Sequence, residues 1–525
     1  MARAVSQMLK SSGALGLATM ISRVLGMVRE MVYARFMGDG WVAGAFVLAF
    51  QIPNLFRRLL GEGALTAAFI PVFKEKEKTG TPAEMWRAAN AMISGLVAVS
   101  GILIALAMTG LSLVLLFGGL PEQTRLLLSL LRLMFPYMLL VCVAAVFIAM
   151  LNARGHFFIP AMGATMLNVV MIASVLWLAP RLGTELKDQI FGLAIGVLLA
   201  GLAQAAFQLP SLRQEGYRPA WVSPWRDETV RRVVRLMIPG AIGLAAVQIN
   251  VLLTQALAFW VNPTIVASFG YAVRLMELPQ GVIGISFATY LLPTLAGLAA
   301  EKNFGEFRAT IQKGLAYVFY INLLASVLLL VLAEPVVRLL FERGQFGPLA
   351  TQRAALALAC LAPSLAAYSM VTILARGFYA LSDTQTPMKI SIFCLGVNLV
   401  LVFLLVFPFA QGGLGMANTL SATANAALLY YALRRKLREL DLGEMQPHLL
   451  IVLLLALGAG VTAWVSAWGW EYGFGHSTLA RKIGAVFVPM SLAAALYLAG
   501  GAWFKIGMGG EAWKILKTRL NRKRA

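Results

Sequence analysis

The chain has 525 residues, of which 60% are hydrophobic and only 13% are charged. This composition excludes a globular cytosolic enzyme and indicates a membrane protein. The 44 lysines and arginines exceed the 23 acidic residues and give a formal net charge of +21. Because the basic residues lie in short segments between apolar runs, membrane topology explains the excess better than nucleic-acid binding, which we do not expect.

Apolar runs long enough to cross a hydrocarbon core of about 30 Å recur along the whole chain. They predict a polytopic, all-α membrane protein with 14 transmembrane helices. In chain order, the predicted spans cover residues 12–37, 41–73, 90–118, 127–152, 160–180, 188–210, 234–260, 268–300, 313–333, 350–376, 387–409, 412–434, 448–468 and 483–505.

The distribution of basic residues between the spans predicts the orientation. Of the 44 lysines and arginines, 29 lie in the N-terminus, the even-numbered loops and the C-terminal tail, and 10 lie in the odd-numbered loops. Cytoplasmic loops carry the excess of basic residues. Both termini are therefore expected in the cytoplasm.

Motifs recur at an offset of 227 residues and indicate an internal repeat. Gly13 matches Gly240, Pro136 matches Pro363, and Pro160 matches Pro387. Six spans per copy predict two lobes related by a pseudo-two-fold axis along the membrane normal. The expected domains are an N-terminal lobe (1–210), a cytoplasmic linker loop (211–233), a C-terminal lobe (234–434), two extra helices (445–505) and a basic cytoplasmic tail (506–525).

Five arginines interrupt the apolar spans, and all of them lie in the first two spans of a repeat. They are Arg23, Arg29, Arg57, Arg58 and Arg274. Each would cost about 2.5 to 3.5 kcal/mol at the centre of a lipid-facing helix. They are therefore expected to face a watery cavity.

Pairing with acids is the alternative role for these arginines. Arg58 and Glu62 are four residues apart, Arg274 and Glu277 are three apart, and Arg23 shares a helix face with Glu30. Five arginines against three glutamates still leave a net charge of +2. This surplus favours an anionic ligand, because the planar guanidinium binds phosphate or carboxylate through two hydrogen bonds.

Catalytic and metal-binding motifs are not found. The three histidines are scattered and form no HExxH motif, and the sequence has no P-loop and no GxSxG motif. Cys142, Cys360 and Cys394 lie inside predicted spans without CxxC spacing. We expect no enzyme activity, no cofactor and no metal site.

Two segments carry a family resemblance. Ser22 to Glu30 reads SRVLGMVRE, and Pro53 to Ala64 reads PNLFRRLLGEGA. Together with RLMELPQG from Arg274, these segments resemble the MurJ (MviN) family of bacterial lipid II flippases, within the multidrug/oligosaccharidyl-lipid/polysaccharide exporter superfamily. The resemblance covers nearly the whole chain and agrees with 14 helices in two six-helix lobes plus two.

The resemblance implies a transporter of peptidoglycan precursor in the bacterial inner membrane. A central cavity would hold the diphosphate and sugar of lipid II, an undecaprenyl-diphosphate-linked precursor, and open alternately to cytoplasm and periplasm. Membrane lipids would be the other partners, and the protein would be monomeric. The substrate-binding residues carried over are Arg23, Arg29, Arg57 and Arg274, with Glu30, Arg58, Glu62 and Glu277 in supporting or gating roles.

The chain departs from the family pattern at three positions. Gly44 and Val273 stand where many relatives have Asp, and Thr254 stands where some relatives have a sodium-binding Asp. A sodium site is therefore not expected. Two alternative functions stay open, namely export of another polyprenyl-diphosphate-linked saccharide and multidrug antiport, although an antiporter would favour cavity carboxylates and twelve spans.

The last two spans lie outside the repeat. A polyprenyl tail cannot enter an arginine-lined cavity without exposing hydrocarbon to water or burying charge. We expect residues 445–505 to form a lipid-facing groove for the tail, an expectation that the resemblance also favours. The alternative is that this pair pads the second lobe or anchors the C-terminal tail.

Overall fold

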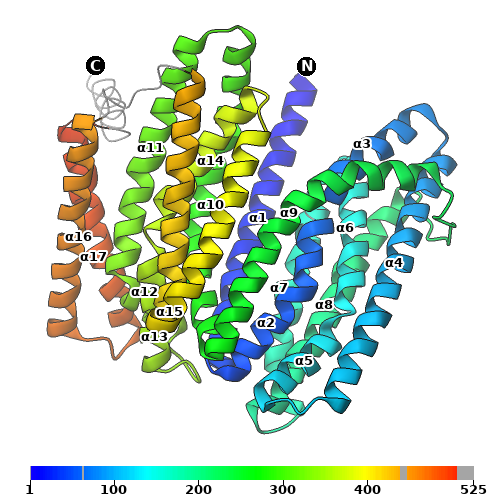
Figure 1. Ribbon diagram of the computed structural model, residues 1–525, viewed down its shortest axis with the longest axis horizontal. Coiled ribbons are helices and arrows are strands. Elements are labelled where there is room, and N and C mark those ends of the chain that lie inside the picture. Colours follow the sequence, from blue (N-terminus) through cyan, green and yellow to red (C-terminus); the bar gives the residue numbers. More distant parts are fainter. Residues whose placement is uncertain (1, 62–63, 438–445, 505, 507–525) are drawn as a thin grey trace. The chain divides into compact units, whose positions relative to one another are not determined.

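The computed structural model describes residues 2–61, 64–437, 446–504 and 506, and all regular structure in these ranges is helical (Figure 1). Residues 1–267 and 268–525 form two compact units. In the described ranges, nine helices are long and apolar enough to cross a membrane, or ten if one bent pair counts as a single span. The prediction of a polytopic all-α membrane protein is confirmed.

Among the described residues, the first unit contains nine whole α-helices. They are α1 (Ala2–Met37), α2 (Trp41–Phe56), α3 (Ala64–Thr79), α4 (Pro82–Phe117), α5 (Glu122–Met134), α6 (Tyr137–Ala153), α7 (Phe158–Ala173), α8 (Leu186–Gln214) and α9 (Glu228–Val261). A π-helical turn, η1 (Arg57–Gly61), follows α2, and two short turns, η2 (Ser174–Leu178) and η3 (Ala179–Arg181), extend α7. A core of buried residues from α3, α4, α6, α8 and α9 joins these helices and includes Phe69, Met150 and Val233.

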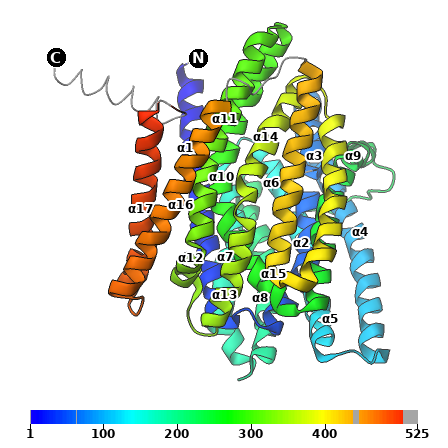
Figure 2. The same cartoon turned by 60° about the vertical axis from the view of Figure 1, so that its left-hand side comes forward.

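The second unit contains the remaining helices. They are α10 (Pro263–Ala300), whose first five residues belong to the first unit, α11 (Phe304–Val331), α12 (Ala333–Phe341), α13 (Pro348–Leu361), α14 (Ser364–Ala380), α15 (Gln385–Leu437), α16 (Gln446–Phe474) and α17 (Leu479–Trp503). Figure 2 shows α16 and α17 as an antiparallel pair. The core of this unit joins α10, α11, α14 and α15 and includes Phe307, Phe378 and Leu433.

Several predicted spans are broken helices. The predicted span 127–152 is divided between α5 and α6, and the span 350–376 is divided between α13 and α14, which are bent by 40° at the break. The predicted spans 387–409 and 412–434 both lie in α15, which is interrupted at Ala410, where φ is 49°. The breaks between helices therefore do not always fall at the ends of the apolar runs.

The prolines that indicated a repeat occupy equivalent positions in the two units. Pro136 precedes α6 with φ −62° and ψ −18°, and Pro363 precedes α14 with φ −62° and ψ −24°. Pro160 is the third residue of α7, and Pro387 is the third residue of α15. Proline fits the first turn of a helix because the amide hydrogens there have no intrahelical acceptor. The shared offset thus reflects shared local structure.

Helix α9 packs within the first unit. Val233 of α9 is buried in the core of that unit, and Ala64 of α3 lies 3.6 Å from the position that a Cβ on Gly240 would occupy. Our lobe boundary at residue 234 was drawn from the sequence repeat, whereas the compact units divide after Ala267. The lobe assignment stays a prediction, because it concerns the repeat and not packing.

Candidate functional site

Arg29 is a buried cation on α1. Its Nη2 donates to Glu30 Oε1 at 2.5 Å, and its guanidinium carbon lies 5.4 Å from the centre of the Tyr33 ring. The Tyr33 ring meets Phe46 of α2 edge to face, with 6.1 Å between the ring centres. The Nε of Arg29 is buried and has no hydrogen-bond partner among the described residues. Arg29 therefore has an acidic partner at Nη2 and an unsatisfied, buried donor at Nε in the described part of the chain.

Arg57 and Arg58 lie on the π-helical turn η1. The Nε of Arg57 donates to Asn54 Oδ1 at 2.7 Å, within the same helix run. Arg58 Nη1 lies 3.4 Å from Gln248 Oε1 on α9. A π-helical turn widens the helix and is found frequently at functional sites. Here it directs one arginine along its own helix run and the other toward α9.

Arg23 is exposed on α1, one turn and a half before Arg29. No hydrogen bond or ion pair connects it to another residue that the structure describes. The backbone beside it is held by α7, because Asn168 Nδ2 donates to Ser22 O at 3.2 Å. Asn168 thus makes an interhelical hydrogen bond, and within the described part of the chain the Arg23 guanidinium donors have no acceptor.

Arg274 lies on α10 in the second unit. Its Nη1 donates to Glu277 Oε2 at 2.8 Å, and both side chains are about 40% exposed. In the first unit, Arg23, Arg29 and Glu30 lie on α1, and Arg57 and Arg58 lie on η1. The sequence-predicted acid Glu62 lies outside the described residues.

Gly44 of α2 packs against the start of α10. A Cβ at this position would lie 2.1 Å from the carbonyl oxygen of Pro263, which is closer than any real contact. Only glycine allows this approach. This contact gives a physical reason for the departure from the family pattern at Gly44, because an aspartate there would require the two segments to move apart.

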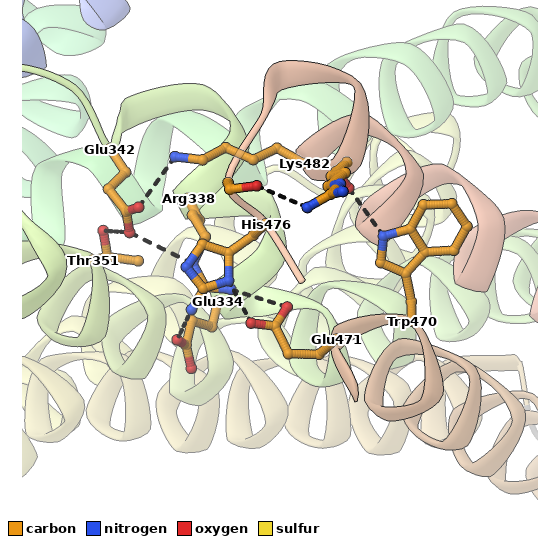
Figure 3. Close-up of polar contacts among 10 residues, drawn as sticks. Glu334, Arg338, Glu342, Thr351, Trp470, Glu471, His476 and Lys482 are labelled. Carbon is orange, nitrogen blue, oxygen red and sulfur yellow. Dashed lines mark hydrogen bonds and ion pairs between the residues drawn. The ribbon is translucent and has the colours of Figure 1, made fainter. Parts of the chain in front are cut away.

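A second group of charged residues was not predicted from the sequence. It forms an ion cluster in the second unit, shown in Figure 3. Its members are Glu334, Arg338 and Glu342 from α12 and the residue after it, Glu471 from α16, and Lys482 from α17. The spacing of four residues from Glu334 to Arg338 to Glu342 was the available sequence signal.

The ion cluster attaches the α16–α17 pair to α12. Lys482 Nζ lies 3.1 Å from Glu342 Oε1, and Arg338 Nη1 lies 3.6 Å from Glu471 Oε2. Thr351 donates to the second oxygen of Glu342 at 2.9 Å. Burial raises the pKa of Glu342, but Thr351, Lys482 and Arg338 together hold that pKa below its ordinary value. Glu342 therefore stays ionised and binds both α12 and α17.

Another charged group lies at the ends of α3, α6 and α8 in the first unit. Arg154 pairs with Glu77 and, at 2.6 Å, with Glu215. His156 Nε2 lies 2.7 Å from the other oxygen of Glu215. Hydrogen bonds from His156 and Arg154 hold the pKa of Glu215 below its ordinary value. These pairs join three helix ends that are far apart in the sequence.

The fold and these sites define a class of protein, namely a polytopic α-helical transporter with cationic side chains on apolar helices. Among the described residues, no group of three or more His, Cys, Asp or Glu side chains could hold a metal ion. The fold is similar to the solved structure "Lipid II flippase MurJ, inward closed conformation", with TM-score 0.77, 20% identity, and coverage of 93% of this chain and 98% of that chain. A multidrug resistance MATE family transporter of the MOP superfamily in an inward-facing conformation gives TM-score 0.64 at 15% identity, covering 80% and 95% of the two chains.

Sequence comparison identifies the particular family. The family model "Lipid II flippase MurJ" matches residues 33–483. A relative from Haemophilus influenzae named "Probable lipid II flippase MurJ" is 35% identical over 477 residues, which cover 85% of this chain and 90% of that protein. The "Lipid II flippase MurJ" of Burkholderia cenocepacia is 31% identical over 428 residues, covering 80% and 82%. The chain therefore belongs to the MurJ family, and the resemblance found in the sequence is confirmed.

Proposed function

We propose that this chain translocates lipid II from the cytoplasmic to the periplasmic leaflet of the bacterial inner membrane by alternating access. Membership of a family of lipid II flippases carries the proposal. The arginines on apolar helices support it, because they are costly in lipid unless they serve an anion or pair with acids. The chain would act as a transporter and not as an enzyme.

Arg23, Arg29, Arg57 and Arg274 would hold the diphosphate and sugar headgroup. Arg23 has no partner among the described residues, and Arg29 has a buried Nε without an acceptor. Arg23 can therefore donate to phosphate oxygens without breaking an existing hydrogen bond, whereas Arg29 would first have to expose its buried Nε. The guanidinium binds phosphate in a bidentate geometry that lysine does not reproduce.

Glu30, Glu277, Arg58 and Glu62 would support or gate this site. Glu30 holds Arg29, and Glu277 holds Arg274, at 2.5 and 2.8 Å respectively. An arginine that is already fixed by a carboxylate loses less rotamer freedom when a ligand binds. The acids would thus orient the cations and lower the unfavourable charge density before substrate enters.

The helices α16 and α17 would guide the polyprenyl tail. Their outer residues are strongly apolar and exposed, as Leu457 and Leu496 illustrate. The pair is held to α11 by Tyr320 and Tyr497 and to α12 by the ion cluster. A fixed apolar face next to lipid fits a tail better than it fits a charged headgroup.

The orientation and assembly of the chain complete the proposal. The 29 basic residues on one predicted side support a cytoplasmic location for both termini. The protein would act as a monomer, with the two six-helix lobes moving as halves of one transporter. Lobe boundaries at residues 210 and 234 follow the sequence repeat.

The alternative function is export of another polyprenyl-diphosphate-linked saccharide. This function would use the same cationic residues and the same fold. Only the transported substrate would distinguish it from lipid II transport. A multidrug antiporter would have the fold of the matched MATE transporter. The arginines on the apolar helices do not support this function.

Complementation tests the proposed function. The gene is expressed in a bacterium whose lipid II flippase is depleted, and growth, cell shape and peptidoglycan synthesis are measured. We expect rescue by the parent chain and by Arg125→Ala, which changes an exposed arginine outside the site. Failure of the parent chain at normal membrane levels, with accumulation of a different lipid-linked saccharide, would contradict lipid II as the substrate.

A further inference from the structure

The segment between α8 and α9 is fixed to the first unit by its backbone. We call residues 217–227 the α8–α9 strap. Asn90 Nδ2 of α4 donates to Arg218 O at 2.9 Å, and the amide of Val222 donates to Ser94 Oγ at 3.1 Å. Pro224 is buried, 3.2 Å from the position of a Cβ on Gly95. The strap is therefore an ordered segment that lies along the third and fourth turns of α4 (Figures 1 and 2).

The outer side of the strap exposes two tryptophans. Trp221 is 67% exposed and Trp225 is 63% exposed, whereas Tyr217 at the start of the strap is buried against Trp86. Exposure of this size is unfavourable in water for a residue whose position is fixed, because the indole ring is large and mostly apolar. The strap thus leaves two aromatic rings largely exposed.

Arginines lie near these tryptophans in the sequence. Residues 217–235 contain five arginines and two acids, which leaves a net charge of +3. Arg232 pairs with Glu75 at 2.8 Å, and Asp227 caps α9 by accepting from the Thr229 and Val230 amides. By contrast, Arg218, Arg226 and Arg235 are exposed and have no ion pair with any other residue that the structure describes.

The position of the strap along α4 indicates its depth in the membrane. Asn90 and Ser94 lie where the long apolar run of α4 begins, and only 6% of the apolar window of α4 is buried inside the protein. Helix α4 therefore presents an apolar surface that fits a lipid environment. A strap bonded to its third and fourth turns, where the apolar run begins, would lie at the level where tryptophan is enriched in membrane proteins, between hydrocarbon and water.

We propose that the α8–α9 strap binds anionic phospholipid. Trp221 and Trp225 insert among the headgroups, while Arg218 and Arg226 hold lipid phosphates beside them. Tryptophan favours this layer because one part of the ring is apolar and the N–H is polar. Basic residues beside the bilayer attract anionic lipids. The proposal concerns bulk phospholipid and does not depend on the proposed substrate.

Fluorescence quenching by lipid tests this inference. The full chain is placed in nanodiscs that contain brominated phosphatidylglycerol or brominated phosphatidylcholine at equal bromine content and no lipid II. The difference in tryptophan emission between the parent and Trp221→Phe/Trp225→Phe reports the strap alone. We expect stronger quenching of this difference signal by phosphatidylglycerol than by phosphatidylcholine.

Charge variants and matched controls complete the test. Arg218→Gln/Arg226→Gln should reduce the preference for phosphatidylglycerol, on the order of five-fold for each arginine removed. Trp260→Phe and Arg181→Gln, which change exposed residues elsewhere in the same unit, should leave the preference unchanged. Equal quenching by both lipids would overturn the proposal. So would quenching of the strap signal by aqueous iodide and not by brominated lipid, a result that would instead indicate a protein-docking surface.

Discussion

Arg29 and Glu30 form an ion pair of 2.5 Å on α1, with both side chains nearly buried, at 11% and 12% exposure. The pair leaves the Nε of Arg29 without a partner in the described part of the chain. The Glu30 carboxylate neutralises the buried Arg29 guanidinium, so the charge can be stable inside the protein. The Nε without a partner could still donate to an anion. The structure thus shows the pairing role for Arg29, and its role in ligand binding stays a prediction.

Glu30→Gln should therefore destabilise the protein. It leaves the Arg29 charge buried with only a neutral partner, at a cost of about 1 to 3 kcal/mol. Thermal unfolding of the purified protein in detergent measures the change, with Glu185→Gln as the control, because Glu185 is 64% exposed. An unchanged Tm for Glu30→Gln would show that the ion pair has no structural role.

Gly44→Ala should destabilise the packing of α2 against the start of α10. The added methyl group meets backbone and not a movable side chain, so about 1 to 3 kcal/mol of overpacking strain is expected. Gly101→Ala on α4 is the matched control, since nothing lies within 4 Å of its Cβ position. Thermal unfolding should show a lower Tm for Gly44→Ala only. Equal Tm values for the two variants would contradict the close approach.

Tyr497→Phe should loosen the α16–α17 pair. Tyr497 and Tyr320 each donate a hydroxyl hydrogen to the other's backbone carbonyl, at 2.9 and 3.2 Å, and their rings stack with centres 4.6 Å apart. Loss of one hydroxyl should cost about 1 kcal/mol. Tyr472→Phe is the control, because Tyr472 is 87% exposed. The same Tm for both variants would argue against the reciprocal pair as an attachment.

Asp383 should stabilise the folded protein, and the size of this stabilisation should change with pH only at acidic pH. The Lys436 ammonium, together with hydrogen bonds from Thr386, lowers the pKa of Asp383 from 3.8 to about 2. A lowered pKa gives stability that is complete above the ordinary value and is lost as pH falls through about 4 toward 2.

The difference in unfolding free energy between the parent and Asp383→Asn checks this expectation. It should be constant from pH 5 to pH 8, on the order of 1 kcal/mol, and should shrink below about pH 4. A difference that instead changed between pH 6 and pH 8 would show that a group other than Asp383 is responsible.

The fold was largely predictable because apolar run length and repeated prolines are local signals. Pro136 and Pro363 share an offset in the sequence and the same backbone conformation before α6 and α14. The π-helical turn at Arg57 and Arg58 was not predicted, since an apolar run does not reveal how its helical hydrogen bonds shift by one residue.

The candidate arginines were found from the energetics of charge in lipid, but their partners were predicted less well. The sequence placed Glu30 on the helix face of Arg23, seven residues away, whereas the structure pairs Glu30 with its neighbour Arg29. The Lys482–Glu342 contact joins residues 140 positions apart. Such contacts depend on tertiary packing, so spacing along one helix cannot reveal them.

The most direct test of lipid II transport is a translocation assay with purified chain in proteoliposomes. Lipid II is loaded into the vesicles, and its headgroup is followed by an impermeant hydrolase added outside. The parent chain should expose internal lipid II to the hydrolase. Arg57→Ala and Arg274→Ala should reduce the rate at least ten-fold at equal reconstitution, while Arg125→Ala should match the parent. Transport by both site variants at the parental rate, or no transport by the parent chain, would contradict the account.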